Sequence, residues 1–161
     1  MAITVFSQSW AVLGSQITCT IDSLSNGANR QSDEVNNLTT AFLDVHLMVV
    51  VRTQSSTISS AGTVEVYGYG QVGDAVPYRT DTATAVDGLI PNIPNARFIG
   101  AVQANSGSVT YPGGPFSVAN AFGGILPSKW GIIVANRTGN VISNSGGVNA
   151  LYFSGYWEKG V

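Results

Sequence analysis

The sequence predicts an all-β fold, either a sandwich or a barrel, and three observations support this prediction. The chain has 161 residues, of which 44% are hydrophobic, enough for one domain with a self-supporting core. Short runs rich in β-branched and aromatic residues recur along it, separated by Gly, Pro and Asn. No segment keeps a helical period over the length of a stable helix. We therefore predict one β domain over residues 1–161.

The clearest strand signal spans residues 39–52, followed after a Ser/Thr-rich loop by a second signal at residues 63–69. In the first segment the alternating set from Leu43 to Val51 is aliphatic and is expected to face the core. The other set starts with Asp44 and His46 and then turns apolar. We predict that the two segments pair as an antiparallel hairpin with a long tip.

The remaining elements follow from the same patterns. Further strands are expected at residues 3–6, 15–21, 75–78, 96–104, 108–111, 130–136 and 148–157. Single helical turns are expected at residues 32–35 and 117–122, the second stopped by Gly123-Gly124. Loops are expected at residues 23–37 and 70–95, and a hairpin turn at residues 137–140.

Charge is sparse in this chain. Charged residues make up 10% of it and the net charge is −2, against roughly 25% charged residues in an ordinary soluble domain. The seven basic residues are scattered, so no nucleic-acid partner is expected. The low charge fits two kinds of protein, a permanently assembled subunit and a secreted domain with a neutral Ser/Thr/Asn surface.

Targeting signals and cysteine content narrow the class of protein further. The longest apolar run, residues 47–51, is too short to span a membrane, so no membrane partner is expected. The first residues lack the basic start and long apolar centre of a signal peptide, so we expect the protein to be made in a cytoplasm. Cys19 is the single cysteine, and its alternation with Ile17 and Ile21 favours a buried small hydrophobe over a reactive thiol.

Few residues are candidates for catalysis or metal binding. Asp44 and His46 share a strand face and, with a serine, have two of the parts of a nucleophilic triad, but no Gly-x-Ser-x-Gly elbow is present. His46 is the only histidine, which excludes a multi-histidine metal site. Asp74, Asp81 and Asp87 match no calcium-loop spacing and are expected to be solvated. We therefore predict no catalytic residue, metal or cofactor.

Aromatic residues are the remaining candidates. Tyr67 and Tyr69 share a face with Glu65, and Tyr152, Tyr156 and Trp157 crowd the C-terminal strand. Exposed aromatic groups at this density are typical of protein interfaces and of sugar-binding platforms. Burial on the second face of a sandwich is the alternative for each of them.

Four segments of the C-terminal half, residues 96–100, 114–119, 122–127 and 129–139, resemble small virion proteins of tailed bacteriophages. The resembling motifs are a Gly-Gly-x-Leu-Pro turn, Trp130 and the turn at residues 137–140, which are structural and carry over no functional residue. The resemblance implies an antiparallel β-sandwich, jelly-roll-like, that decorates or cements a capsid or belongs to a tail.

These observations together predict a non-enzymatic virion protein, assembled in the host cytoplasm. Its expected partners are the major capsid protein and its own copies, with a trimer favoured. The alternatives are a tail or fibre-attachment protein bound to a tail component, and a carbohydrate-binding module with a glycan partner. Residues 1–14 are predicted to form an assembly arm, and the expected contact residues are Ile3, Val5, Phe6, Trp10, Tyr67, Tyr69, Tyr78, Ile90, Ile93, Tyr152, Tyr156 and Trp157.

Overall fold

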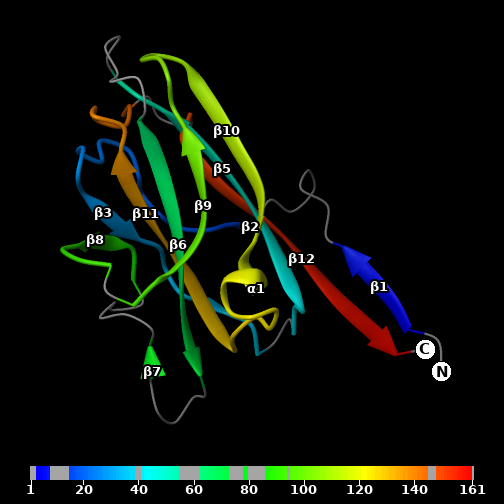
Figure 1. Cartoon of the computed structure of the whole chain (residues 1–161). Coiled ribbons are helices and arrows are strands. Elements are labelled where there is room, and N and C mark those ends of the chain that lie inside the picture. The colour runs from blue at the N-terminus through cyan, green and yellow to red at the C-terminus, as the bar shows by residue number, and fades with distance from the viewer. Residues whose placement is uncertain are drawn as a thin grey trace.

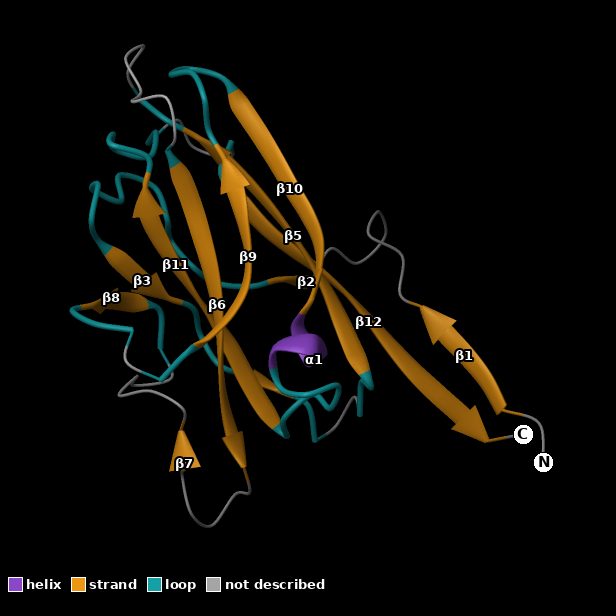
Figure 2. Cartoon of the chain, in the orientation of Figure 1, coloured by secondary structure: helices purple, strands orange, loops and turns teal. Residues whose placement is uncertain are grey.

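The computed structural model describes residues 3–7, 15–38, 41–54, 62–72, 78–79, 86–93, 95–144 and 148–160. Strands dominate these residues, as predicted (Figures 1 and 2). In chain order the elements are β1 (Ile3–Ser7), β2 (Ser15–Gln16), β3 (Asn29–Gln31), β4 (Val35–Asn36), β5 (Asp44–Arg52), β6 (Thr63–Val72), β7 (Tyr78–Arg79), β8 (Gly88–Ile90), β9 (Arg97–Gln103), β10 (Thr110–Ser117), α1 (Val118–Ala121), β11 (Lys129–Arg137) and β12 (Ala150–Gly160).

Two antiparallel sheets pack against each other. The first, here called the β5 sheet, has the order β2-β12-β5-β10, with β1 on the far end of β12. The second, here called the β6 sheet, has β3 and β4 on one edge of β11 and β6 on the other, followed by β9; β8 extends it beside β3 and β7 beside β6. The chain crosses from one sheet to the other at several connections, among them β4 to β5, β5 to β6 and β9 to β10. The predicted antiparallel β-sandwich is confirmed.

The core lies between the sheets and follows from period-two alternation. Along β5 the side chains of Val45, Leu47, Val49 and Val51 are fully buried and their neighbours half-buried, so the predicted core face is confirmed for these four. Leu43, predicted to join them, precedes the strand and is 47% exposed. From the β6 sheet come Val64, Val66, Trp130, Ile132 and Val134, and the Trp130 ring meets that of Phe153 edge-on at 5.6 Å between centroids.

The predicted hairpin between residues 39–52 and 63–69 is wrong. Strand β5 pairs with β10 and β12, whereas β6 pairs with β11, β9 and β7 in the opposite sheet. Each strand has one apolar face, and the two faces meet across the core, so consecutive strands need not lie side by side. For the same reason the turn at residues 137–140 joins strands of opposite sheets and is no hairpin.

The smaller elements divide between confirmed and wrong predictions. Helix α1 is confirmed: Ser117 caps it by accepting a hydrogen bond from the Asn120 N–H at 3.1 Å, and Gly123-Gly124 follows it at positive φ. The helical turn at residues 32–35 is wrong, because β4 begins there. The predicted loop at residues 23–37 contains β3. No helix of the described residues has the length and apolarity to cross a membrane.

Strand β12 is longer than the sandwich. It pairs with β5 from Ala150 to Tyr156 and with β1 from Tyr156 to Gly160, in the register Ser7↔Tyr156 to Ile3↔Gly160. Figures 1 and 2 show these last residues and β1 running away from the body of the molecule as a two-stranded extension. We call β1 together with residues 156–160 of β12 the terminal ribbon.

Candidate contact surfaces

The Asp44/His46 pair lies on the outer face of the β5 sheet, in a row that also includes Ser117 and Tyr156. Ser117 Oγ donates a hydrogen bond to Asp44 Oδ2 at 2.8 Å, and the Ala119 N–H donates to Asp44 Oδ1 at 2.9 Å. His46 Nε2 lies 3.5 Å from Asp44 Oδ2, and its Nδ1 lies 3.1 Å from the Tyr156 hydroxyl. The order along the row is therefore serine, aspartate, histidine and tyrosine.

This order is not that of a Ser-His-Asp triad. In a nucleophilic triad the imidazole lies between the hydroxyl and the carboxylate, so that it accepts the hydroxyl proton. Here the hydroxyl that reaches Asp44 belongs to the N-cap of α1, and the free imidazole nitrogen faces a tyrosine. The row ties the start of α1 to β5 and explains the pair as a structural feature.

Replacing Asp44 by Ala should lower the free energy of unfolding by about 1–2 kcal/mol, because α1 loses the acceptor for Ser117 and for the Ala119 N–H. Replacing His46 by Ala should lower it by less than about 1 kcal/mol, since His46 is partly exposed and its tyrosine partner keeps access to water. Urea unfolding of both variants measures the two losses. A larger loss for His46→Ala than for Asp44→Ala would contradict this account.

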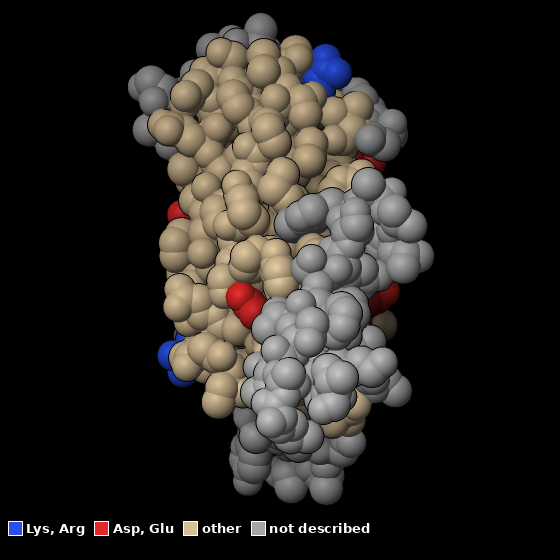
Figure 3. Space-filling model, turned by 90° about the vertical axis from the view of Figure 1, so that its right-hand side faces the viewer, with Lys and Arg blue, Asp and Glu red and all other residues tan. Residues whose placement is uncertain are grey.

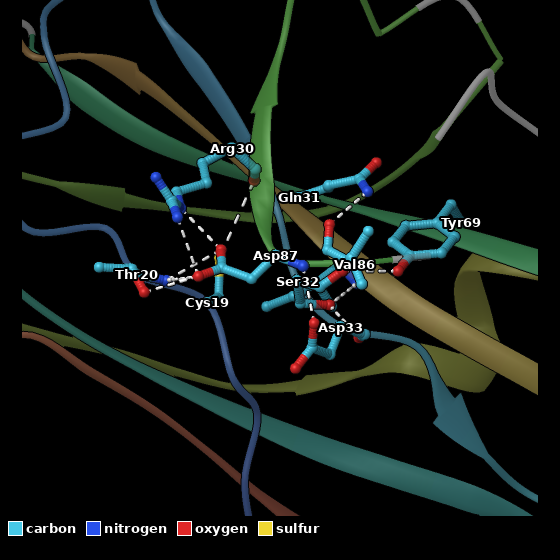
Figure 4. Close-up of polar contacts among 10 residues, drawn as sticks. Cys19, Thr20, Arg30, Gln31, Ser32, Asp33, Tyr69, Val86 and Asp87 are labelled. Carbon is cyan, nitrogen blue, oxygen red and sulfur yellow. Dashed lines mark hydrogen bonds and ion pairs between the residues drawn. The ribbon is translucent and has the colours of Figure 1, made fainter. Parts of the chain in front are cut away.

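A second polar cluster joins the segment before β8 to β3 (Figure 4). Arg30 binds Asp87 through two parallel hydrogen bonds, from Nε to Oδ1 at 2.6 Å and from Nη2 to Oδ2 at 2.9 Å. Thr20 adds its hydroxyl at 2.6 Å and its N–H at 3.1 Å, and the Asp87 N–H donates to Asp33 Oδ1 at 2.7 Å. Gln31 Nε2 donates to the Val86 carbonyl at 2.6 Å. The cluster therefore holds residues 86–88 against β3.

Charge and burial within this cluster oppose each other at Asp87. Burial alone raises the pKa of the Asp87 carboxyl, but the hydrogen bonds from Arg30 and Thr20 outweigh burial and hold the pKa below its ordinary value. The hydrogen bond to Asp87 in turn raises the pKa of Arg30. Both carboxylate oxygens of Asp87 are occupied by these donors, so the cluster is an anchor between charged groups.

One of the three acids predicted to be solvated, and the single cysteine, lie among the described residues. Asp87 is engaged by Arg30, so its prediction as a solvated acid is wrong, while Asp74 and Asp81 lie outside the described residues. Within the described ranges no three potential metal ligands lie together. Cys19 packs against the core half-buried, and burial raises the pKa of its thiol far above the usual range, which leaves the unreactive protonated form.

Tyr69 was predicted to be an exposed contact residue, and this is wrong. Its side chain is 1% exposed, and its hydroxyl donates to the Ser32 carbonyl at 2.8 Å. The ring lies over Gly131, its partner on β11, where the missing side chain leaves room for it. Period-two alternation places Tyr69 on the outer face, but the empty position on the neighbouring strand lets the ring lie flat and be buried.

Tyr67 lies on the same outer face of the β6 sheet and is half-buried. Its hydroxyl donates to Glu65 Oε2 at 2.8 Å, and its ring meets that of Phe98 edge-on with centroids 5.6 Å apart. Burial, together with the hydrogen bond to Glu65, raises the pKa of Tyr67. Phe98, which the sequence analysis did not single out, is 57% exposed.

The other predicted contact residues are dispersed. Tyr152 is 37% exposed on β12, Tyr156 is half-buried against His46, and Ile90 and Ile93 are half-buried in and after β8. Trp10 lies outside the described residues, and the structure describes the backbone alone for Ile3, Val5, Phe6, Tyr78 and Trp157. Two strongly exposed apolar side chains were missed, Leu89 at 68% and Ile125 at 78%, because each stands in a short apolar pair, which gives no periodic signal of which side chain faces solvent.

The outer face of the β5 sheet presents apolar side chains in cross-strand rows. Val50 pairs in register with Pro112 on β10 and with Ala150 on β12, and Met48 pairs with Tyr152. Met48 and Val50 are half-buried, Ala150 is buried beside them, and Pro112 and Tyr152 are exposed. Figure 3, which views the molecule from the side of this sheet, shows only scattered charged atoms on the described surface. We call Met48, Val50, Pro112, Ala150 and Tyr152 the apolar rows.

Comparison with known proteins gives no relative. No family model matches the sequence, and no match appears among curated proteins or solved structures.

Proposed function

We propose that this chain is a structural protein of a tailed-bacteriophage virion, which decorates or cements the capsid through contacts with the shell and with its own copies. The apolar rows carry this proposal. They form a weakly charged sheet face, and the strand that supplies Ala150 and Tyr152 continues into the terminal ribbon. One side of the molecule thus offers an extended apolar surface for binding another protein.

The energetics of such a contact are favourable. A stable protein interface buries about 1,200–2,000 Å² in total, and its centre is depleted of charged residues. Burial of a charge without a partner opposes association, because the charge loses its water. The central rows of this face, Met48, Val50, Pro112 and Tyr152, carry no charge and gain from the removal of apolar surface from water. The Asp44 carboxylate on the same face already accepts hydrogen bonds from Ser117 and from the Ala119 N–H.

The fold is compatible with this role, because jelly rolls recur in viral capsid proteins as well as in lectins. Fold alone does not decide function. The resemblance of residues 96–139 to small phage virion proteins, together with the 10% content of charged residues, favours the assembled subunit over the lectin. The proposed partners are the shell protein and further copies, in a trimer.

Electron microscopy of the assembled particle tests the location. Copies of the protein on the outer surface of the shell would support the proposal. Absence from the particle would refute it, and presence at the tail alone would replace the capsid role by a tail or fibre-attachment role.

Replacing Tyr152 by Lys tests the surface. Tyr152 is already 37% exposed, so the variant should fold, but the added charge should weaken self-association and shell binding at least tenfold. Phe98→Lys is the matched control, because Phe98 is 57% exposed on the opposite sheet. Sedimentation analysis and co-sedimentation with shells lacking the protein give both readouts. Equal effects of the two substitutions would contradict the assignment of this face.

A glycan-binding module is the second candidate, and the Tyr67–Phe98 pair favours it. A half-exposed aromatic ring held edge-on by a second ring is a platform on which a sugar can stack. Binding on a glycan array that Phe98→Ala abolishes would support this candidate, and an array without signal would remove it.

A further inference from the structure

Strand β1 pairs with one described strand. It forms an antiparallel ladder with the end of β12, from Ile3↔Gly160 to Ser7↔Tyr156, and pairs with no other described strand. The first part of β12 is fixed in the sandwich between β5 on one edge and β2 on the other. The partner strand of β1 is thus anchored in the body of the molecule, whereas β1 is attached through the ladder.

The ribbon is a weak structure when it stands alone. A two-stranded antiparallel pair is marginally stable in water without a third strand or a packed face. Beyond Tyr156 the edge of β12 opposite β1 has no partner among the described strands, because β5 ends in register with Tyr156 at Asp44. The described strands give the ribbon no third member, so the ladder between β1 and β12 can open and form again with the same segment of a second copy.

The ladder itself does not require that both strands belong to one chain. Its bonds are backbone bonds, and a second copy offers the same β12 end in the same register. Residues 8–14 separate β1 from β2, and a link of this length reaches at most about 25 Å when extended. The link therefore limits the exchange to a copy whose β12 end lies within that reach.

We propose that β1 is exchanged between copies of this chain, so that β1 of one copy pairs with residues 156–160 of its neighbour. Donation in one direction around a ring closes after a fixed number of copies and leaves no β1 without a partner. Exchange keeps each backbone hydrogen bond of the ladder. It also connects each pair of neighbouring copies, because the β1 bound to one copy is covalently part of the next. The inference rests on the proposed function, because it names the second copy as the partner of the terminal ribbon.

A disulfide across the ladder tests the exchange. Val5 and Glu158 are Cα partners, and such partners lie about 4.5–5.5 Å apart, within the disulfide range of roughly 4.4–6.8 Å. The variant Val5→Cys/Glu158→Cys, in a Cys19→Ala background, is oxidised and run on a denaturing gel without reductant. Exchange predicts covalent multimers that end at the size of the ring and collapse to one band on reduction.

Thr63→Cys/Gln103→Cys is the matched control, because these Cα partners lie on β6 and β9 inside one sandwich, on the sheet opposite the apolar rows. It should give cross-linked monomers only. A second ladder pair, Thr4→Cys/Lys159→Cys, repeats the test if the first variant folds poorly.

The outcomes separate the exchange from the proposed function. If both ladder pairs cross-link within single chains at every protein concentration, the exchange is refuted. In that case an oligomeric mass of the uncross-linked protein would leave the proposed function standing. A monomeric mass together with absence from the virion would refute both.

Discussion

Gly131→Ala should lower the free energy of unfolding by about 3 kcal/mol. A methyl group at this position would overlap the ring of Tyr69, its Cα partner on β6. The ring cannot move aside without loss, because Tyr69 is 1% exposed and its hydroxyl donates a hydrogen bond to the Ser32 carbonyl at 2.8 Å. Overpacking of a dense interior costs about 1–3 kcal/mol, and displacing the ring also breaks its hydrogen bond, at about 1 kcal/mol. Urea unfolding at neutral pH measures the loss.

Two further variants identify the cause of this loss. Gly88→Ala is the matched control, because a methyl group at Gly88 in β8 would meet its nearest atom at 3.8 Å, an ordinary contact. Tyr69→Ala vacates the space over Gly131, so Gly131→Ala should cost much less in that background than in the wild type. Equal costs in the two backgrounds would show that the ring is not the obstacle.

The sequence predicted the sandwich because alternation along a strand reports which side chains face inward. Strand β5 is the clearest example, with its four aliphatic residues at every second position fully buried. Alternation does not report which strands are neighbours, since any two apolar faces satisfy the same core. The β5–β6 hairpin was predicted wrongly for that reason, and the jelly-roll-like order was predicted from the resemblance alone.

Strand β3 shows the other limit of sequence analysis. Its residues Asn29 and Gln31 are 6% and 0% exposed, although a polar segment predicts a loop. Their amide groups donate to backbone carbonyls of the β8 segment, at Ile90 and Val86. Burial of these amides is tolerated because their N–H groups donate to those carbonyls, and the donors and acceptors lie some 60 residues apart in the chain. No local pattern contains that information.

The candidate surfaces, like the fold, were predicted only in part. Tyr152 was identified from the density of aromatic residues, but the apolar rows need the register that places Pro112, Val50 and Ala150 side by side. The Arg30–Asp87 pair was missed, because a single arginine and a single aspartate 57 residues apart carry no signal until the fold joins them.

Asp87→Asn should lower the free energy of unfolding at neutral pH by about 3 kcal/mol, because it removes one partner of a largely buried ion pair and leaves Arg30 without its counter-charge. An asparagine has the shape of the aspartate but accepts through one oxygen only, so two parallel bonds from Arg30 become one. Asp22→Asn is the control, since Asp22 accepts from Asn149 but pairs with no cation in the described part of the chain. Thermal or urea unfolding should separate the two variants clearly.

The same substitution should change the response to acid. The folded state holds the pKa of Asp87 below its ordinary value, so its contribution to stability is complete above the unfolded-state pKa of about 3.9 and is lost as the pH falls through the folded-state pKa. Wild-type protein should therefore lose more stability than Asp87→Asn when the pH is lowered from about 5 to about 2. The difference between the two unfolding free energies, followed across that interval, should shrink. A difference that stays constant with pH would mean that Arg30 does not stabilise the charged form of Asp87, and that the anchor between β3 and β8 depends on shape and neutral hydrogen bonds.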